Sequence, residues 1–134
     1  MAKIIDVEGI GTKYAEMLGK AGISTTDDLL KAGSTPKGRR DLAERTGIGD
    51  ALILKWVNHV DLYRIKGVGS EYSELLEAAG VDTIPELAQR NAANLAQKIT
   101  EVNLVKKLVR KLPVESQIAD WIEQAKKLPR IINY

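Results

Sequence analysis

The sequence predicts an all-α protein made of two related helical units, and three observations support this prediction. The segment Gly9-Ile10-Gly11 recurs 58 residues later as Gly67-Val68-Gly69, and nine of the 21 positions from Gly9 to Leu29 are identical in the two copies. Along the chain, apolar residues follow helical spacing and are bounded by capping residues, Gly and Pro. The chain is 44% apolar but contains only two Trp, four Tyr and no Phe, so aliphatic side chains must form a core that suits packed helices. A repeat at a fixed offset predicts an architecture that is built from related units.

The first expected unit, residues 1–60, contains short helices separated by capped turns. They cover, in order, residues 12–21, a stretch from a Thr25 cap to Gly33, residues 37–45 after the start signal Thr35-Pro36, and a longer stretch from an Asp50 cap to Tyr63. Gly22 is expected to end the first helix as a left-handed C-terminal glycine. Gly47-Ile48-Gly49 has the Gly-x-Gly pattern but no repeated continuation, so we interpret it as a turn.

The second expected unit, residues 61–134, repeats this plan with additional residues before its last helix. Its expected helices cover residues 70–79, 85–90, a stretch from Asn91 or Asn94 through Ile99, 103–112 and 114–127. Within 103–112, the apolar residues expected to point inward are Leu104, Val105, Leu108, Val109 and Leu112. Each unit then has roughly five helices, and units of this size are marginal on their own. Because no linker separates them, we expect the two units to pack as one rigid body.

Trp56 and Trp121 occupy matching positions in the two units. Ile53-Leu54-Lys55-Trp56-Val57 corresponds to Ile118-Ala119-Asp120-Trp121-Ile122 at an offset of 65 rather than 58, so the second unit has seven extra residues near Asn103–Pro113. We expect each Trp to be largely buried and to close the core of its unit.

Each repeated Gly-x-Gly motif predicts a tight turn between two helices, because glycine accepts positive φ and close backbone approach. The apolar residue between the glycines is expected to be buried, and the hydroxyls of Thr12 and Ser70 are expected to cap the helices that follow. A helix start with unpaired N–H groups attracts anions, so each turn is a candidate phosphate site. The candidate binding residues are Gly9, Ile10, Gly11, Thr12, Lys13, Lys66, Gly67, Val68, Gly69 and Ser70. The alternative is a helix corner that holds no ligand.

The formal net charge of +2 identifies no partner, but the charges are unevenly distributed. Residues 92–134 carry eight basic and four acidic side chains, whereas residues 61–91 carry three basic and six acidic ones. The candidate basic patch comprises Arg39, Arg40, Lys106, Lys107, Arg110 and Lys111. Glu8 and Glu71 lie close to the Gly-x-Gly turns in the sequence and oppose anion binding there, which favours a protein partner.

The sequence shows no set of residues typical of catalysis. It contains no Cys and a single histidine, His59, with no nucleophile paired to it. No metal-ligand cluster, NTPase phosphate loop or dinucleotide fingerprint occurs. We therefore expect no enzyme activity, metal, cofactor or small-molecule substrate. The start of the chain has no signal-peptide pattern and no apolar run approaches about 18 residues, so we expect a cytoplasmic protein without a membrane segment.

The motif Gly9-Ile10-Gly11 followed by Ala15 resembles a helix-hairpin-helix motif. Its continuation from Leu18 to Leu29 is similar to that found in recombinase N-terminal domains and in the C-terminal domain of the polymerase α-subunit. Nearly the whole chain resembles a bacterial family, common in cyanobacteria, of tandem helix-hairpin-helix proteins of unknown function. This resemblance implies two tandem five-helix, SAM-like units. Helix-hairpin-helix relatives usually bind the DNA backbone through the amides of the turn, without sequence preference, and relatives of the five-helix fold also bind proteins.

Two functions therefore stay open at the level of the sequence. The first is a nucleic-acid-binding module whose two turns hold phosphates of duplex DNA without reading its sequence. The second is a protein-interaction or scaffold module without nucleic acid. If DNA is the ligand, the turns and the basic residues should lie on one face.

Overall fold

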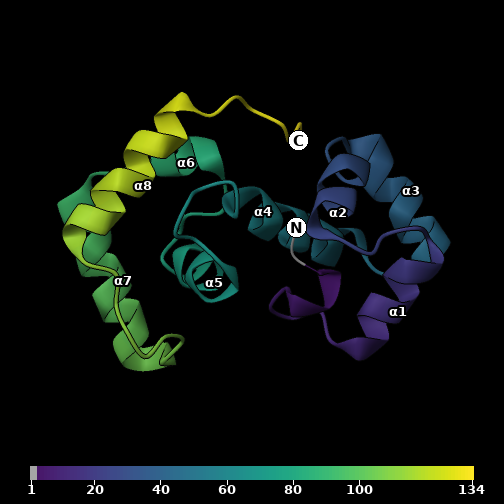
Figure 1. The fold of residues 1–134 in the computed structure, drawn as a ribbon, viewed down its shortest axis with the longest axis horizontal. Helices are drawn as coiled ribbons and strands as arrows, with labels where there is room; N and C mark the ends of the chain where they lie inside the picture. Colours follow the sequence, from purple (N-terminus) through teal and green to yellow (C-terminus); the bar gives the residue numbers. More distant parts are fainter. Residues whose placement is uncertain (1–2) are drawn as a thin grey trace. The chain divides into compact units, whose positions relative to one another are not determined.

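The computed structural model describes residues 3–134, and α-helix dominates this range (Figure 1). Eight α-helices and one short 3-10 helix follow one another, and the described residues contain no β-strand, only an isolated bridge between Lys3 and Thr25. The predicted all-α class is therefore confirmed. Within the same range, every helix is too short or too polar to span a bilayer.

The chain divides into two compact units. The first comprises the chain up to Asp61 together with Ile131–Tyr134, and the second comprises Leu62–Arg130. The sequence repeat predicts a boundary between residues 60 and 61, with every later residue in the second unit. Residues 131–134 differ from that expectation, because they pack with the first unit.

The first unit begins with a 3-10 helix, η1 (Ile4–Asp6), and continues with four α-helices. These are α1 (Thr12–Lys20), α2 (Thr26–Ala32), α3 (Pro36–Thr46) and α4 (Asp50–Leu62). α3 packs against both α1 and α2, and α1 also contacts η1. Trp56 on α4 has 0% of its surface exposed, which confirms the predicted burial. The ring of Tyr14 meets Trp56 edge-on, with 5.1 Å between ring centroids.

Local hydrogen bonds explain where α2 and α3 begin. Thr25 Oγ1 accepts a hydrogen bond from the Asp28 N–H at 3.1 Å, and Asp28 Oδ2 accepts one from the Thr25 N–H at 3.1 Å, so the two residues form a capping box. Thr35 Oγ1 accepts a 3.0 Å hydrogen bond from the Gly38 N–H at the start of α3. Gly22 has φ +87°, which confirms the predicted left-handed glycine after α1.

The C-terminal residues pack on the first unit through Arg39. Ile132 is 2% exposed, and the Asn133 N–H donates a 2.8 Å hydrogen bond to Ser34 O. Arg39 Nη1 donates to Gly33 O at 2.8 Å and Nη2 donates to Asn133 O at 2.9 Å, so the guanidinium ties α3 to this tail. Arg39 is only 7% exposed, so the prediction that it belongs to an exposed basic patch is wrong. The reason is a partner distant in sequence, which the local pattern of α3 does not show.

The second unit consists of four helices after the end of α4. These are α5 (Ser70–Ala78), α6 (Ile84–Ala88), α7 (Ala92–Lys106) and α8 (Glu115–Lys127). α8 packs along both α6 and α7, and α7 also contacts α5 (Figure 1). Trp121 on α8 is 1% exposed and lies in the apolar core, as predicted. Tyr72 approaches its ring with 5.3 Å between centroids, so the Tyr–Trp pair of the first unit recurs.

Two helices of the second unit start at side-chain caps. Thr83 Oγ1 accepts a 3.2 Å hydrogen bond from the Glu86 N–H at the start of α6. Asn91 Oδ1 accepts a 3.1 Å hydrogen bond from the Asn94 N–H, so Asn91 rather than Asn94 caps α7. The local signals for a helix start are therefore reliable at these positions.

The expected helix over residues 103–112 is wrong. α7 continues to Lys106, Lys107 turns the backbone to φ +50°, and residues 107–114 form an irregular loop before α8. Asn103 Nδ2 donates to Val109 O at 3.0 Å, and Asn103 Oδ1 accepts from the Val109 N–H at 3.0 Å. A side-chain amide that binds backbone groups in this way competes with the continuation of a helix.

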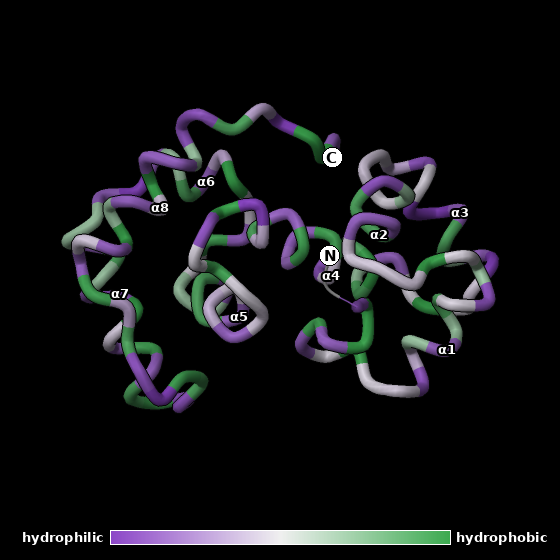
Figure 2. The backbone as a smooth tube through the Cα atoms, viewed as in Figure 1, coloured by the Kyte–Doolittle hydropathy of each residue, from purple (hydrophilic) through white to green (hydrophobic). Residues whose placement is uncertain are grey.

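This loop changes which apolar residues are buried. Val109 is 8% exposed, and Leu108 and Leu112 are partly buried against the core. Leu104 and Val105, which were expected to point inward, are 73% and 82% exposed at the end of α7. Figure 2 shows hydrophobic residues interspersed with hydrophilic ones along the end of α7 and the loop. The helix boundary, rather than the apolar pattern, decided which of these side chains reach the core.

Candidate nucleic-acid interface

The two Gly-x-Gly turns adopt the same backbone conformation. Gly9 and Gly67, the first glycine of each motif, have φ of +88° and +96°. Residues with a side chain rarely adopt this region, whereas glycine does so readily. Gly11 and Gly69, the second glycines, have φ of −86° and −112°, which any residue can adopt. Backbone conformation therefore requires only the first glycine of each motif.

The residue between the glycines anchors each turn to the core. Ile10 is 2% exposed, and its N–H donates a 2.9 Å hydrogen bond to Val7 O. Val68 is 5% exposed, and its N–H donates a 3.1 Å hydrogen bond to Ile65 O. The predicted burial of both residues is confirmed. These two candidate residues shape the turns, and their side chains are withdrawn from any ligand in solution.

A buried tryptophan lies directly behind each turn. A Cβ added to Gly9 would lie 3.5 Å from Trp56 Nε1, and one added to Gly67 would lie 3.1 Å from Trp121 Nε1. Among the atoms that the structure describes, Trp56 Nε1 is buried and has no hydrogen-bond partner. Each indole therefore supports its turn from the inside. The repeat placed the two tryptophans in matching positions, but no sequence signal connected them with the turns.

The helices that follow the turns start without a side-chain cap. Gly11 and Gly69 are the N-cap residues of α1 and α5, and neither residue has a side chain that could make a capping hydrogen bond. The expected capping by Thr12 and Ser70 is wrong, because each is the first residue inside its helix. Capping requires extended dihedrals and a side-chain oxygen at the same residue, and glycine supplies only the dihedrals.

The absence of a cap distinguishes these two helix starts from most others. The side-chain caps of α2, α3, α6 and α7 are Thr25, Thr35, Thr83 and Asn91. α8 also begins without one, at Val114. A Cβ added to Gly11 or Gly69 would meet nothing within 4 Å, so the backbone at both turns borders open space. The positive end of each helix dipole is therefore accessible at the turns.

Lys13 and Lys66 are both exposed, but they lie differently around their turns. Lys13 belongs to the first turn of α1. Lys66 precedes Gly67, and Gln124 of α8 binds both of its backbone groups: Oε1 accepts from the Lys66 N–H at 2.8 Å, and Nε2 donates to Lys66 O at 3.2 Å. Gln124 therefore fixes the second turn to α8, and Lys66 offers its ammonium group, not its N–H, to a ligand.

The structure places the residues of the expected basic patch in different environments. Arg39 is buried, whereas Arg40 is exposed on the same helix. Lys106 is the last residue of α7. A cavity of about 580 Å³ is lined by Glu71 and Tyr72 from the first turn of α5 and by Lys107, Leu108, Val109, Arg110 and Lys111 from the loop. Three of the six residues of the expected patch, Lys107, Arg110 and Lys111, therefore lie beside α5.

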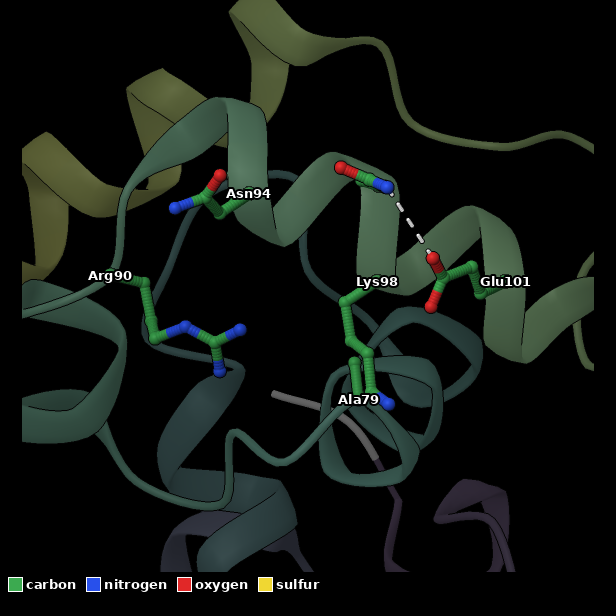
Figure 3. A pocket seen from close by; sticks show the side chains of 6 residues that line it. Ala79, Arg90, Asn94, Lys98 and Glu101 are labelled. Carbon is green, nitrogen blue, oxygen red and sulfur yellow. Dashed lines mark hydrogen bonds between the residues drawn. The ribbon is translucent and has the colours of Figure 1, made fainter.

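Other cavities show a mixture of charges. One of about 330 Å³ in the second unit is lined by Arg90, Lys98 and Glu101 among others, and Gln97 Nε2 donates a 3.5 Å hydrogen bond to Glu101 Oε1 (Figure 3). One of about 430 Å³ in the first unit is lined by Pro36, Arg39, Arg40, Asp50, Ala51 and Leu54. His59 is 1% exposed and therefore inaccessible to a substrate. Over residues 3–134, no three His, Asp or Glu side chains are grouped as metal ligands.

The fold and these turns define an all-α protein with a duplicated glycine turn backed by tryptophan. The chain belongs to the family described as Domain of unknown function (DUF4332), whose family model matches residues 8–128. This match includes both Gly-x-Gly turns, both tryptophans and the loop at residues 107–114. No curated protein and no solved structure matches the chain.

Proposed function

We propose that the protein is a non-catalytic helix-hairpin-helix module that binds the phosphate backbone of duplex DNA without sequence preference. The observation that carries this proposal is the pair of equivalent Gly-x-Gly turns, each followed by a helix whose start has no side-chain cap. In this proposal each unit is one helix-hairpin-helix module, and the protein acts on DNA in the cytoplasm without a metal or cofactor.

An uncapped helix start is chemically suited to a phosphate group. The first N–H groups of a helix have no acceptor within the helix, and the helix dipole adds partial positive charge there. Phosphate oxygens accept hydrogen bonds from such groups. Contacts of this kind position a protein on DNA but read no base. The open space beside Gly11 and Gly69 supports this proposal, because a nucleic-acid backbone needs room to approach the amides.

Charged side chains near the turns indicate a weak rather than a tight interaction. Lys13 and Lys66 are exposed beside the two turns and would attract phosphate. Glu8 and Glu71 are exposed near the same turns and oppose that attraction. Because phosphate contacts are electrostatic, we expect the affinity to depend strongly on salt. Because the net charge of the protein is only +2, we expect the affinity to be low at physiological ionic strength.

Salt-dependent binding tests the proposed function. With about four phosphates held, log affinity should fall with log salt at a slope near −3.6, at about −0.9 per phosphate. Fluorescence anisotropy would compare two duplex DNAs of unrelated sequence, a single-stranded DNA and a duplex RNA. Equal affinity for the two DNA duplexes with this slope supports the proposal. A strong preference for one sequence, or no binding at low salt and high micromolar protein, contradicts it.

A protein-interaction function is the second candidate, because apolar side chains are exposed at the end of α7. Leu104 and Val105 are 73% and 82% exposed, and exposed apolar side chains favour a protein surface as partner. A pull-down from lysate treated with nuclease would compare the native chain with a Leu104→Ser, Val105→Ser variant. A partner that survives nuclease and is lost with the variant supports this function.

A further inference from the structure

The second unit contains a basic loop that the first unit lacks. α7 has 15 residues whereas α3 has 11, and residues 107–114 follow α7 where only Gly47-Ile48-Gly49 follows α3. The short turn contains no charged residue, whereas the loop contains Lys107, Arg110 and Lys111. The extra residues of the second unit therefore supply a cluster of cations.

We propose that this loop and the first turn of α5 form a binding site for a phosphate group of a nucleic acid, which gives the second unit a phosphate site that the first unit lacks. The site is the cavity of about 580 Å³ lined by Glu71, Tyr72 and residues 107–111. The inference rests on the proposed function for the source of the phosphate. The loop and its cations define the site itself.

Hydrogen bonds hold the loop in one conformation. Asn103 binds both backbone groups of Val109 at 3.0 Å each, and Val109 is 8% exposed. Tyr72 Oη donates a 3.0 Å hydrogen bond to Lys111 O, and the Tyr72 ring packs near Trp121. The loop is thus attached to α7 at one side and to α5 at the other. A fixed backbone lowers the entropy that is lost when its side chains bind a ligand.

The cations of the loop are available to an anion. Lys107, Arg110 and Lys111 are exposed, and within the described part of the chain none of their side chains forms an ion pair or a hydrogen bond. Three cations around one concave surface repel each other, and a bound phosphate relieves that repulsion. Arg110 adds directional recognition, because a guanidinium can bind two phosphate oxygens at once.

The acidic residue in the cavity determines where in the site a phosphate can bind. Glu71 lies in the first turn of α5 and lines the same cavity. Its carboxylate repels a phosphate that enters the cavity on the side of Glu71, so the favourable position within the cavity is toward Arg110 and Lys111. Removing this charge should strengthen binding, which no purely structural role of Glu71 would produce.

Two sources provide the same chemistry, a phosphodiester inside a duplex and a phosphate at a 5′ end. The test uses the full chain labelled with ¹⁵N and three probes: inorganic phosphate, a short duplex with 5′-hydroxyl ends, and the same duplex with 5′-phosphates. The loop variant is Lys107→Gln, Arg110→Gln, Lys111→Gln. The matched control removes three exposed cations from the first unit, Lys20→Gln, Lys31→Gln, Lys37→Gln. Circular dichroism checks that both variants are folded.

The expected results distinguish binding at the loop from binding elsewhere on the surface. Inorganic phosphate should shift the amide signals of residues 70–72 and 107–111. The loop variant should lose roughly tenfold or more in duplex affinity, and its salt slope should fall by about 0.9, the value for one phosphate contact, whereas the control should lose much less. Glu71→Gln should bind more tightly than the native chain. Equal affinity for the two duplexes assigns the phosphodiester, and tighter binding of the phosphorylated one assigns the 5′ end.

Other outcomes overturn the inference or the proposed function separately. Equal losses in the loop variant and the control, or phosphate shifts absent from residues 107–111, overturn the site. If the duplex binds and the loop variant keeps full affinity, the site is overturned and the proposed function stands. If inorganic phosphate shifts the loop signals but no duplex binds, the phosphate site stands and the proposed DNA-binding function fails.

Discussion

Gly67 combines a conformational and a packing requirement at a single residue. Its φ of +96° excludes most side chains, and an added Cβ would approach Trp121 Nε1 to 3.1 Å. Gly69, two residues later, meets neither requirement, because its φ is −112° and an added Cβ would meet nothing within 4 Å. The two glycines of a motif that looks symmetrical in the sequence therefore have different roles.

Substitution of the two glycines by alanine should reveal this difference. Gly67→Ala should lower the free energy of unfolding by about 1–3 kcal/mol, because it strains the backbone and crowds the indole. Gly69→Ala, the matched control, should change it by less than about 1 kcal/mol. Urea denaturation followed by circular dichroism measures both values. Similar losses in the two variants would show that the turn does not depend on its first glycine.

The tryptophans should be the most costly side chains to remove. Trp56 and Trp121 are 0% and 1% exposed, and each packs against a tyrosine and a glycine turn. Trp121→Ala should lower the free energy of unfolding by roughly 3–5 kcal/mol through the cavity it leaves. Leu104→Ala is the control, because a side chain 73% exposed should cost less than about 0.5 kcal/mol. An unchanged unfolding midpoint in Trp121→Ala would contradict this account of the core.

At the scale of elements, the start of α2 depends on an ionised carboxylate. The Ser24 N–H and the Thr25 N–H each donate a 3.1 Å hydrogen bond to Asp28 Oδ2. These bonds, that from Ser24 first, hold the pKa of Asp28 below its ordinary value of 3.8. A pKa lowered by folding means that the charged form stabilises the folded state.

We expect the Asp28 carboxylate to make the free energy of unfolding depend on pH. The contribution is complete above the ordinary pKa of 3.8 and is lost as pH falls through the lower pKa of the folded state. Asp28→Asn should therefore be less stable than the native chain near neutral pH, and the difference should shrink in strong acid. Asp27→Asn is the matched control, because it removes an exposed carboxylate from the same turn and leaves both hydrogen bonds to Asp28 in place. Urea titrations at a series of pH values measure both differences, and a difference for Asp28→Asn that is independent of pH would refute the assignment.

Asn103 should determine where α7 ends. Asn103→Ala removes both hydrogen bonds to Val109, and at about 0.5–1.5 kcal/mol for each bond the loss should be about 1–3 kcal/mol. Hydrogen exchange of the Val109 amide should accelerate as the loop loosens. Asn94→Ala, exposed on the same helix, is the control and should leave that exchange rate unchanged. Slow exchange at Val109 in Asn103→Ala would show that other contacts hold the loop.

At the scale of the whole molecule, Arg39 connects segments that are 94 residues apart. Its guanidinium is 5.9 Å from the centroid of the Tyr134 ring, and Tyr134 Oη donates a 2.8 Å hydrogen bond to Asn58 Oδ1. The tail at residues 131–134 is therefore held to the first unit by charge-assisted, polar and apolar contacts together. Loss of the arginine leaves the carbonyl of the buried Gly33 without this donor.

Two neighbouring arginines offer a direct comparison. Arg39→Gln should lower the free energy of unfolding by about 1.5–3 kcal/mol and expose the tail to proteolysis, because charge-assisted hydrogen bonds are lost. Arg40→Gln removes the same charge from an exposed position and should have an effect within about 0.5 kcal/mol. Denaturation and limited proteolysis measure these effects. If the two variants behave alike, the tail does not depend on Arg39.

The sequence by itself determined the features that depend on neighbouring residues. The starts of α2, α3 and α6 follow from threonine caps, the end of α1 from Gly22, and the burial of Ile10 and Val68 from the duplicated pattern. The matched positions of Trp56 and Trp121 also followed from the repeat. These features were predictable because a cap, a left-handed glycine and a helical period act within a few residues.

Only the tertiary structure decided the features that depend on distant partners. The burial of Arg39 requires Asn133, and the position of Lys111 beside α5 requires Tyr72. The loop after Lys106 replaced an expected helix because Asn103 binds the backbone of Val109, although the apolar spacing over residues 103–112 suits a helix. Local propensity differs by fractions of a kcal/mol between such alternatives, so the contacts made on folding determine the outcome.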